Sequence, residues 1–208
     1  MIEQDAKARV ASNVPHETFA RLEQLAELVS SENERQNLIA PSTLPIMWSR
    51  HILDSAQLIW LANERVGTWL DIGSGGGFPG IVVGIMRPGP TMLVEPRSKR
   101  AAFLREVTET LGVADRVKVF ASRVETAPLE GKVSIISARA VAALPALFHM
   151  AAAHATESTI WLLPKGRSAA DEVAEARREW QGEMQLVPSL SDPDSAIVVA
   201  QGVRRKRG

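Results

Sequence analysis

The stretch Thr68–Val83, with the sequence TWLDIGSGGGFPGIVV, places five glycines and a single carboxylate, Asp71, between two apolar runs. Pro79 stands where the first turn of a helix tolerates a proline. This order of elements predicts a strand, a loop of bare backbone and a helix. In that context the loop is expected to bind a ligand, and a tight turn without a ligand is the alternative.

The amino-acid composition limits which classes of protein this chain can belong to. The chain has 208 residues, of which 45% are hydrophobic, enough for one domain of ordinary size and an appendage. Its formal net charge is zero, so a nucleic-acid surface would have to be local. The lack of cysteine excludes disulfides and thiolate metal sites. Without a signal peptide or an apolar run of roughly 18 residues, we expect a cytoplasmic protein with no membrane span.

Outward from the loop, two regions differ in pattern. Apolar residues recur at helical spacing from Pro15 to about Asn63, interrupted by a polar, proline-containing segment, which predicts two helical segments. From Thr68 onward, short apolar runs typical of strands alternate with helical ones. We therefore expect an N-terminal helical extension over residues 1–65, a core domain over 66–202 and a mobile basic tail over 203–208.

The core domain is expected to be an α/β fold with a seven-stranded, mostly parallel sheet. Its strands are predicted at 68–72, 91–95, 117–120, 133–137, 159–163, 184–188 and 196–200, and its helices at 79–86, 98–112 and 140–154. The link between the last two strands is too short for a crossover helix, so we expect this pair to be antiparallel.

Acidic residues around the loop indicate which ligand it binds. The pattern Gly75-x-Gly77-x-x-Gly80 satisfies a dinucleotide fingerprint, but a carboxylate at Asp71 would repel a pyrophosphate at the helix N-terminus. S-adenosylmethionine (SAM) has no phosphate, and its ammonium and sulfonium cations can pair with an acid. Glu95, 24 residues after Asp71, is placed to bind a ribose diol in either class of cofactor. Asp71 therefore favours SAM.

Together with further motifs, the glycine loop resembles the bacterial RsmG (GidB) family. The motifs are DIGSGGGFPG, EPRSKRAAFL, SRVE, ISARA, LPKG and the upstream NLI…WSRHILDS, and the resemblance runs from about Leu25 to Val199. It implies a Rossmann-like class I SAM-dependent methyltransferase that modifies guanine N7 in 16S ribosomal RNA of the small subunit. One segment, Glu32–Ile39, lacks the aromatic residues usual in the family, which argues against base stacking there.

The resemblance also implies SAM contacts at Gly73, Phe78, Val124, Glu125 and Arg139. With the loop and its two acids, the predicted cofactor site comprises Asp71, Gly73, Gly75, Gly77, Phe78, Glu95, Val124, Glu125 and Arg139. Val124 and Glu125 follow the strand at 117–120, where a doubly wound fold places its adenine side. An ordinary helix start capped by Ser122 is the alternative.

Two cations are predicted to be catalytic. Arg139 and Lys165 each follow an apolar strand, so both should lie at the carboxyl edge of the sheet. Either could hold an RNA phosphate or the flipped guanine, and a plain salt bridge to a nearby acid is the alternative. No general base is needed, because guanine N7 carries a lone pair and no proton.

A second group of residues is predicted to bind RNA: Arg50, His51, Arg97, Lys99, Arg100 and Lys165. The residues 97–100 open a helix near the expected mouth of the site, and a solvated helix face is their alternative. For Arg50, the alternative is a surface pair with Asp54, one helical turn further on. The histidines show no ligand spacing, so we expect no metal.

Two other functions remain open from the sequence. One is a nucleotide-dependent oxidoreductase that uses the dinucleotide fingerprint, against which Asp71 argues. The other is a non-catalytic, SAM-binding ribosome-assembly factor, against which the retained Arg139 and Lys165 argue. No obligate protein partner is evident from the sequence.

Overall fold

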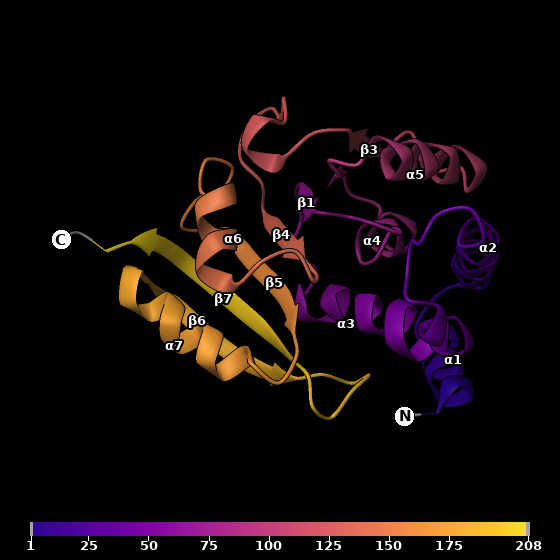
Figure 1. Ribbon diagram of the computed structural model, residues 1–208, viewed down its shortest axis with the longest axis horizontal. Coiled ribbons are helices and arrows are strands. Elements are labelled where there is room, and N and C mark those ends of the chain that lie inside the picture. The colour runs from indigo at the N-terminus through magenta and orange to yellow at the C-terminus, as the bar shows by residue number, and fades with distance from the viewer. Residues whose placement is uncertain (1, 207–208) are drawn as a thin grey trace.

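The computed structural model describes residues 2–206 and contains a seven-stranded sheet with helices on both faces (Figure 1). The strands are β1 (Trp69–Ile72), β2 (Thr91–Val94), β3 (Val117–Phe120), β4 (Ile135–Ala138), β5 (Ile160–Lys165), β6 (Trp180–Pro188) and β7 (Ala196–Arg205). Their order across the sheet is β3-β2-β1-β4-β5-β7-β6. The pairs from β3 to β5 are parallel, whereas β7 runs antiparallel to both β5 and β6. The predicted sheet and its antiparallel last pair are confirmed.

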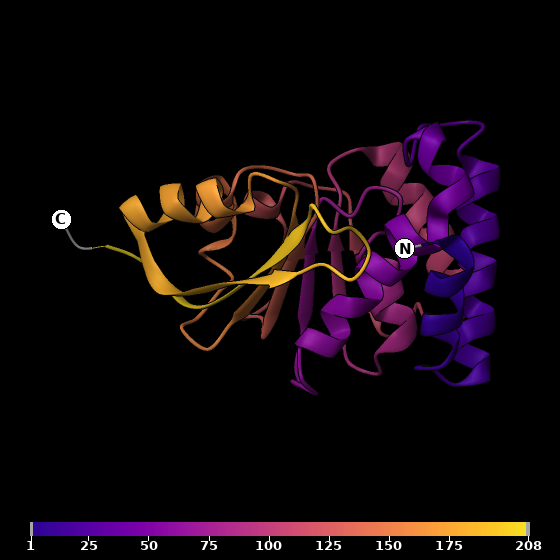
Figure 2. The same cartoon turned by 90° about the horizontal axis from the view of Figure 1, so that it is seen from below.

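Helices cover both faces of this sheet. On one face lie α3 (Asp54–Leu61), α4 (Gly80–Met86) and α5 (Ser98–Thr110), and on the other lie α6 (Leu144–Ala151) and α7 (Ala169–Glu179). Two more helices, α1 (Glu3–Ala11) and α2 (His16–Glu32), form an outer layer at the α4 side (Figure 2). Short helical turns complete the chain: η1 (Pro41–Ile46), η2 (Trp48–Leu53) and η3 (Val124–Thr126).

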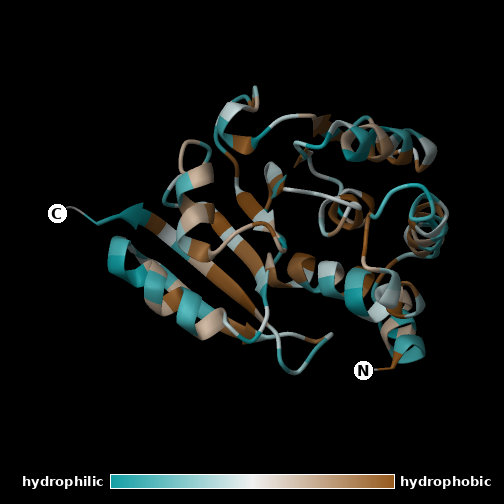
Figure 3. Cartoon of the chain, viewed as in Figure 1, coloured by the Kyte–Doolittle hydropathy of each residue, from teal (hydrophilic) through white to brown (hydrophobic). Residues whose placement is uncertain are grey.

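The central strands are buried on both faces, which explains their nearly unbroken apolar runs. Every residue of β1 and β4 is buried. The neighbouring strands β5 and β7 show brown, hydrophobic stretches in the hydropathy view (Figure 3). Side chains alternate between the faces: Leu70 and Ile72 pack toward α6, while Trp69 packs against Leu58 of α3. The polar residues therefore gather at the strand ends, where the candidate site lies.

The helices α1 and α7 were not predicted. Each buries few and mostly small side chains, Ala6 and Val10 on α1 and Ala169, Val173 and Ala176 on α7. Such a narrow apolar stripe is a weak sequence signal. Both helices nevertheless support the site, α1 through Glu3 and α7 through Glu172.

The predicted tail is wrong for residues 203–205, which belong to β7. Arg205 and Arg204 pair with Trp180 and Gln181 of β6, and an ion pair of 2.7 Å joins Arg204 to Glu157. Pairing with β6 extends β7 through residues 203–205, whose basic side chains had suggested a tail. Residues 207 and 208 lie outside the described part of the chain. Within residues 2–206, no helix is long and apolar enough to cross a membrane.

Candidate active site

A cavity of about 740 Å³ opens at the carboxyl ends of β1, β4 and β5. Strands β1 and β4 are neighbours, but the chain continues from β1 to β2 on one side and from β4 to β5 on the other. Ligands of doubly wound folds bind at such a switch point, and the volume suits a small molecule. The walls are the glycine loop after β1, the loop 139–143 after β4, the N-terminal segment 38–54 and the β6–β7 loop.

Asp71 supports the glycine loop from beneath instead of facing the cavity. Its side chain is fully buried, its Oδ2 accepts the N–H of Gly80 at 3.1 Å, and its Oδ1 accepts the hydroxyl of Ser137 at 2.7 Å. Burial raises the pKa of Asp71 to about 6, although these hydrogen bonds lower it. The predicted direct pairing of Asp71 with SAM is therefore corrected, because the strand points this side chain toward α4. Its carboxylate already holds the N-terminal amide of α4, where a pyrophosphate would otherwise bind.

Glu95, which follows β2, is buried and holds the rim of the same loop. Its Oε2 accepts the N–H of Gly75 at 2.9 Å, and its Oε1 accepts the N–H of Arg97 at 2.8 Å. A carboxylate can accept about four hydrogen bonds, so capacity remains for a ribose hydroxyl. Glu95 does not line the cavity, and its contact with a ribose stays a prediction.

The glycines of the loop divide into two kinds. Gly73 and Gly75 line the cavity and adopt left-handed φ angles of 67° and 56°, which a side chain would strain. Gly77 does not line it; a Cβ there would lie 2.8 Å from Ile81, so this glycine serves packing against α4. Gly76, which sequence reasoning did not single out, also lines the cavity.

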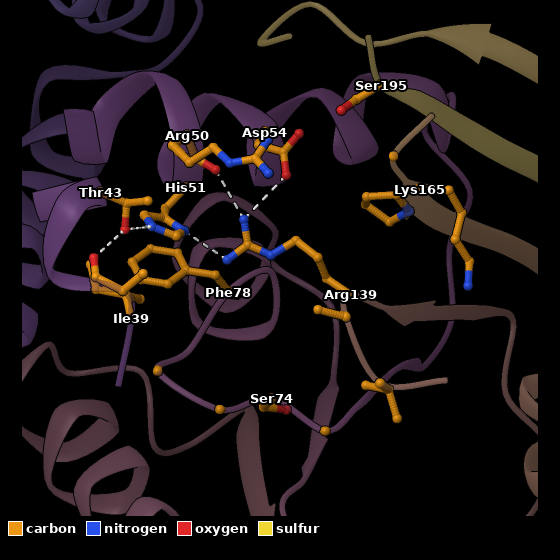
Figure 4. A pocket seen from close by; sticks show the side chains of 18 of the residues that line it. Ile39, Thr43, Arg50, His51, Asp54, Ser74, Phe78, Arg139, Lys165 and Ser195 are labelled. Carbon is orange, nitrogen blue, oxygen red and sulfur yellow. Dashed lines mark hydrogen bonds and ion pairs between the residues drawn. The ribbon is translucent and has the colours of Figure 1, made fainter. Parts of the chain in front are cut away.

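Arg139 lies at the centre of the cavity wall, where residues from the N-terminal helices surround it (Figure 4). Its Nη1 donates to the carbonyl of Arg50 at 3.0 Å and to Oδ2 of Asp54 at 3.2 Å, and its Nη2 donates to Nδ1 of His51 at 2.8 Å. Its guanidinium carbon lies 5.6 Å from the centre of the Phe78 ring. We call Arg50, His51, Asp54 and Arg139 the arginine cluster. The expectation that Arg139 lies at the carboxyl edge is confirmed.

The electrostatics of the arginine cluster follow from its burial. Burial lowers the pKa of Arg139, while the charge and hydrogen bond of Asp54 oppose that change. Burial, and then the charges of Arg139 and Arg50, lower the pKa of His51 to about 3. The imidazole is therefore neutral at physiological pH.

The alternative surface pair between Arg50 and Asp54 is absent. Arg50 pairs instead with Asp192 of the β6–β7 loop at 3.3 Å, and Asp54 pairs with Arg139. The reason is local geometry, because η2 is a π-helical turn and shifts the residues from their α-helical spacing. This pairing joins the N-terminal helices to both loops of the core domain.

Lys165 lines the cavity as predicted for a residue that ends β5, but its ammonium group is already paired. Its Nζ lies 2.7 Å from Glu172 of α7 and donates to the carbonyl of Ala142 at 2.7 Å. The same Glu172 oxygen accepts the N–H of Leu144 at 2.9 Å. Burial alone would raise the pKa of Glu172, but Lys165 and Leu144 lower it. The salt-bridge alternative is thus present, and it clamps the loop that carries Arg139.

The other predicted residues lie further from the cavity. Val124 is buried in the core beside α6, and Glu125 is exposed, so their contact with adenine stays a prediction. Among the predicted RNA contacts, Arg100 lines the cavity and donates to the carbonyl of Asn37 at 2.6 Å. Arg97 and Lys99 are exposed beside it but do not line the cavity.

Several residues of the site were missed by sequence reasoning. They are Thr43, Glu172, Ser189, Asp192 and Ser195. None belongs to a motif that indicates chemistry, and Ser189 and Asp192 bind Gln57 and Arg50, which lie 132 and 142 residues away in the chain. Asp54 was named only as part of a helical motif, and nothing in its neighbourhood indicated Arg139 as its partner.

The residues present fit SAM as a ligand. The cavity combines bare backbone at the glycine loop, the aromatic face of Phe78 and a guanidinium, and the Glu95 carboxylate lies just behind the loop. The bare backbone suits a carboxylate, and the aromatic ring and acid suit an adenosine. With Asp71 at the start of α4, a pyrophosphate fits less well.

Comparison with solved structures identifies the fold. A ribosomal protein L11 methylase from Lactobacillus delbrueckii subsp. bulgaricus superposes with a TM-score of 0.59 at 14% identity, over 76% of this chain and 79% of that chain. An O-methyltransferase from Bacillus cereus, in complex with SAH, superposes with a TM-score of 0.60 at 15% identity, over 88% of this chain and 90% of that chain. The predicted class I methyltransferase fold is confirmed.

Comparison with curated sequences identifies the family. A ribosomal RNA small subunit methyltransferase G from Rhizorhabdus wittichii is 48% identical over 98% of this chain and 94% of its own length. The protein of the same name from Erythrobacter litoralis is 42% identical over 96% of both chains. The family model GidB, rRNA small subunit methyltransferase G, matches residues 18–198. The chain therefore belongs to the GidB family of rRNA small subunit methyltransferase G proteins.

Proposed function

We propose that this protein transfers the methyl group of SAM to N7 of a guanine in the 16S RNA of the small ribosomal subunit, in the cytoplasm. It is a SAM-dependent rRNA methyltransferase, in line with its family. One observation carries the assignment of the site: the glycine loop and Arg139 face a single cavity from the two sides of the switch point between β1 and β4.

Methyl transfer to guanine N7 requires the protein mainly to orient SAM and the guanine relative to each other. When bound, SAM supplies a methyl group on a sulfonium centre. Guanine N7 has a lone pair and no proton, so no residue has to remove a proton from the attacking atom. Orientation of two reactants alone can lower the activation barrier by roughly 7–11 kcal/mol. His51 is not available as a base, because its Nδ1 already accepts a hydrogen bond from Arg139.

We assign roles to the residues on this basis. Gly73, Gly75 and Phe78 bind the cofactor, with Glu95 on its ribose. Arg139 retains two of its five N–H groups without a partner among residues 2–206, one on Nε and one on Nη2. These two groups are suited to hold guanine O6 or a phosphate, away from N7. Arg97, Lys99 and Arg100, beside the cavity, are suited to bind the RNA backbone.

The test uses small subunits that lack the modification. They are incubated with the protein and methyl-labelled SAM, and the RNA is then cleaved chemically at 7-methylguanine. We expect label at one guanine of 16S RNA. Label at another atom or in large-subunit RNA would contradict the proposal. SAM binding without transfer would indicate an assembly factor.

The oxidoreductase alternative is tested by calorimetry on the free protein. We expect SAM and its demethylated product to bind at least about a hundredfold more tightly than NAD or NADP, because the Asp71 carboxylate already accepts the Gly80 N–H at the start of α4, where a pyrophosphate would bind. Tight NAD binding without SAM binding would overturn the assignment.

A further inference from the structure

In the hydrogen bond between Arg139 and His51, the chemistry of the two groups fixes which is the donor and which is the acceptor. All guanidinium nitrogens are donors, so Nδ1 of His51, 2.8 Å from Nη2 of Arg139, must be the acceptor. A neutral imidazole then carries its single proton on Nε2. That nitrogen lies 2.8 Å from the hydroxyl oxygen of Thr43.

The next link is determined in the same way. The hydroxyl of Thr43 donates its proton to the carbonyl of Ala40 at 2.7 Å. Its oxygen therefore accepts from Nε2 of His51. The result is an ordered chain of hydrogen bonds, the relay, which runs from Arg139 through His51 and Thr43 to the backbone at the start of η1 (Figure 4).

We propose that His51, held as the Nε2–H tautomer by Thr43, is a positioning residue that aims the two free N–H groups of Arg139 into the cavity. The proposal rests on the methyl transfer assigned above and adds residues to it. His51 cannot itself reach a ligand through a free nitrogen, because both of its nitrogens are used within the relay. Its effect must therefore pass through Arg139.

The surroundings of His51 oppose any other protonation state. Arg139 faces it from the loop after β4, Arg50 from its own helix, Phe78 from the glycine loop at 5.0 Å between ring centres, and Thr43 from η1. Asp54, the nearby carboxylate, is bound to Arg139. An imidazolium would direct an N–H at the N–H of Arg139 and add a third cation.

The tautomer is tested directly by nitrogen–carbon correlation spectra of the imidazole rings in protein labelled at its four histidines. The His51 signal is assigned by its loss in His51→Asn. We expect a neutral Nε2–H ring that does not titrate between pH 5.5 and 8. An Nδ1–H ring, or a signal that titrates near the ordinary histidine pKa of about 6.5, would overturn the proposal. This readout does not depend on activity.

The positioning role is tested by matched variants in single-turnover methylation of small subunits. His51→Phe keeps a ring against Phe78 but removes the acceptor, and should lower the rate constant about 100-fold, the scale of a displaced catalytic group. His51→Asn restores an acceptor near Nδ1 and should recover most of that loss. Thr43→Val should lower the rate about tenfold, between wild type and His51→Phe, and Thr43→Ser should restore it.

Two outcomes would overturn the positioning role. One is a His51→Phe variant that reacts within about threefold of wild type. The other is an equal loss in His51→Phe and His51→Asn when both variants unfold at the wild-type temperature, since restoring the hydrogen-bond acceptor would then recover none of the rate. If His51→Phe does not fold, the Thr43 pair and the spectra decide. An inactive wild-type protein would contradict the proposed function and leave the tautomer measurement standing.

Discussion

The glycine loop after β1 and the loop after β4 line the same cavity but are held in different ways. The glycine loop is held by two carboxylates that follow or lie within adjacent strands, Asp71 on Gly80 and Glu95 on Gly75. The loop 139–143 is held by side chains from opposite ends of the chain. His51 and Asp54 bind it from the N-terminal helices.

On its other side, the Lys165–Glu172 pair binds the backbone of the same loop. The glycine loop therefore depends on local backbone geometry, whereas the loop after β4 depends on contacts between segments that lie far apart in the chain. Disturbing the glycine loop should mainly affect stability. Removing Arg139 from the loop after β4 should mainly affect the reaction.

The largest effect is expected for Arg139→Ala. Removing a group that holds developing charge or a reactant costs about 100- to 1000-fold in rate, or about 3–4 kcal/mol in the barrier. Single-turnover methylation measures this loss. Arg139→Lys should not restore the rate, because an ammonium cannot make the three planar contacts of the guanidinium. The exposed Arg178 of α7 provides the control as Arg178→Ala, and an equal loss there would refute the role of Arg139.

A pH dependence of stability should come from Asp71. Its folded pKa of about 6 lies above its usual value of 3.8, so the folded state binds more protons between these two values. Its contribution to stability is thus fully present below pH 3.8 and is lost as the pH rises through 6, by about 3 kcal/mol. Urea unfolding of the wild type and Asp71→Asn from pH 4 to 7 measures the change. A constant difference between the two proteins would show that Asp71 is not perturbed.

Gly80→Ala tests the packing of the glycine loop. A Cβ at Gly80 would lie 2.3 Å from the Leu93 side chain and 2.6 Å from the Asp71 carboxylate, both of which are fully buried. We expect the free energy of unfolding to fall by about 2–3 kcal/mol. The matched control is Gly166→Ala, where nothing lies within 4 Å of the added carbon. Similar stabilities of the two variants would contradict this packing.

Lys165→Met tests the clamp on the loop after β4. It leaves the Glu172 carboxylate, whose side chain is 20% exposed, without its cation. We expect a loss of about 1–2 kcal/mol, reduced by partial solvent screening. Lys165→Met combined with Glu172→Gln should recover part of it, because Gln can still accept from Leu144. Strictly additive values in this double-mutant cycle would mean that the pair does not act as a unit.

The smallest effect is expected for Glu3→Gln. The Glu3 carboxylate accepts the backbone N–H groups of Trp48 at 2.6 Å and Ser49 at 2.9 Å, at the start of the helix that presents His51 and Asp54. Removing the charge from this helix N-terminus should cost about 1 kcal/mol in thermal unfolding. Asp5→Asn, which changes an exposed acid on α1, the helix that carries Glu3, is the control. Equal losses of stability in Glu3→Gln and Asp5→Asn would show that the change in net charge, and not the lost hydrogen bonds, is the cause.

The parts of the site that could be predicted are those with a local cause. Glycine-rich loops and short apolar strands have signatures in the residues themselves, so a loop at the end of β1 could be predicted, and its Gly73 and Gly75 line the cavity. The direction of Asp71 could not be predicted, because a strand residue faces either side of a sheet depending on which helix covers it. That choice was made by the packing of α4.

What the sequence by itself determined is the α/β fold, the glycine-rich loop at the end of β1 and the presence of Arg139 and Lys165 at the carboxyl edge. These follow from backbone rules and strand order. What only the tertiary structure decided is which partner each charge has. Asp54 lies 85 residues before Arg139, and Asp192 lies 142 residues after Arg50. Buried charges need partners, but the energy of a pair depends on distance in space, and the sequence records only distance along the chain.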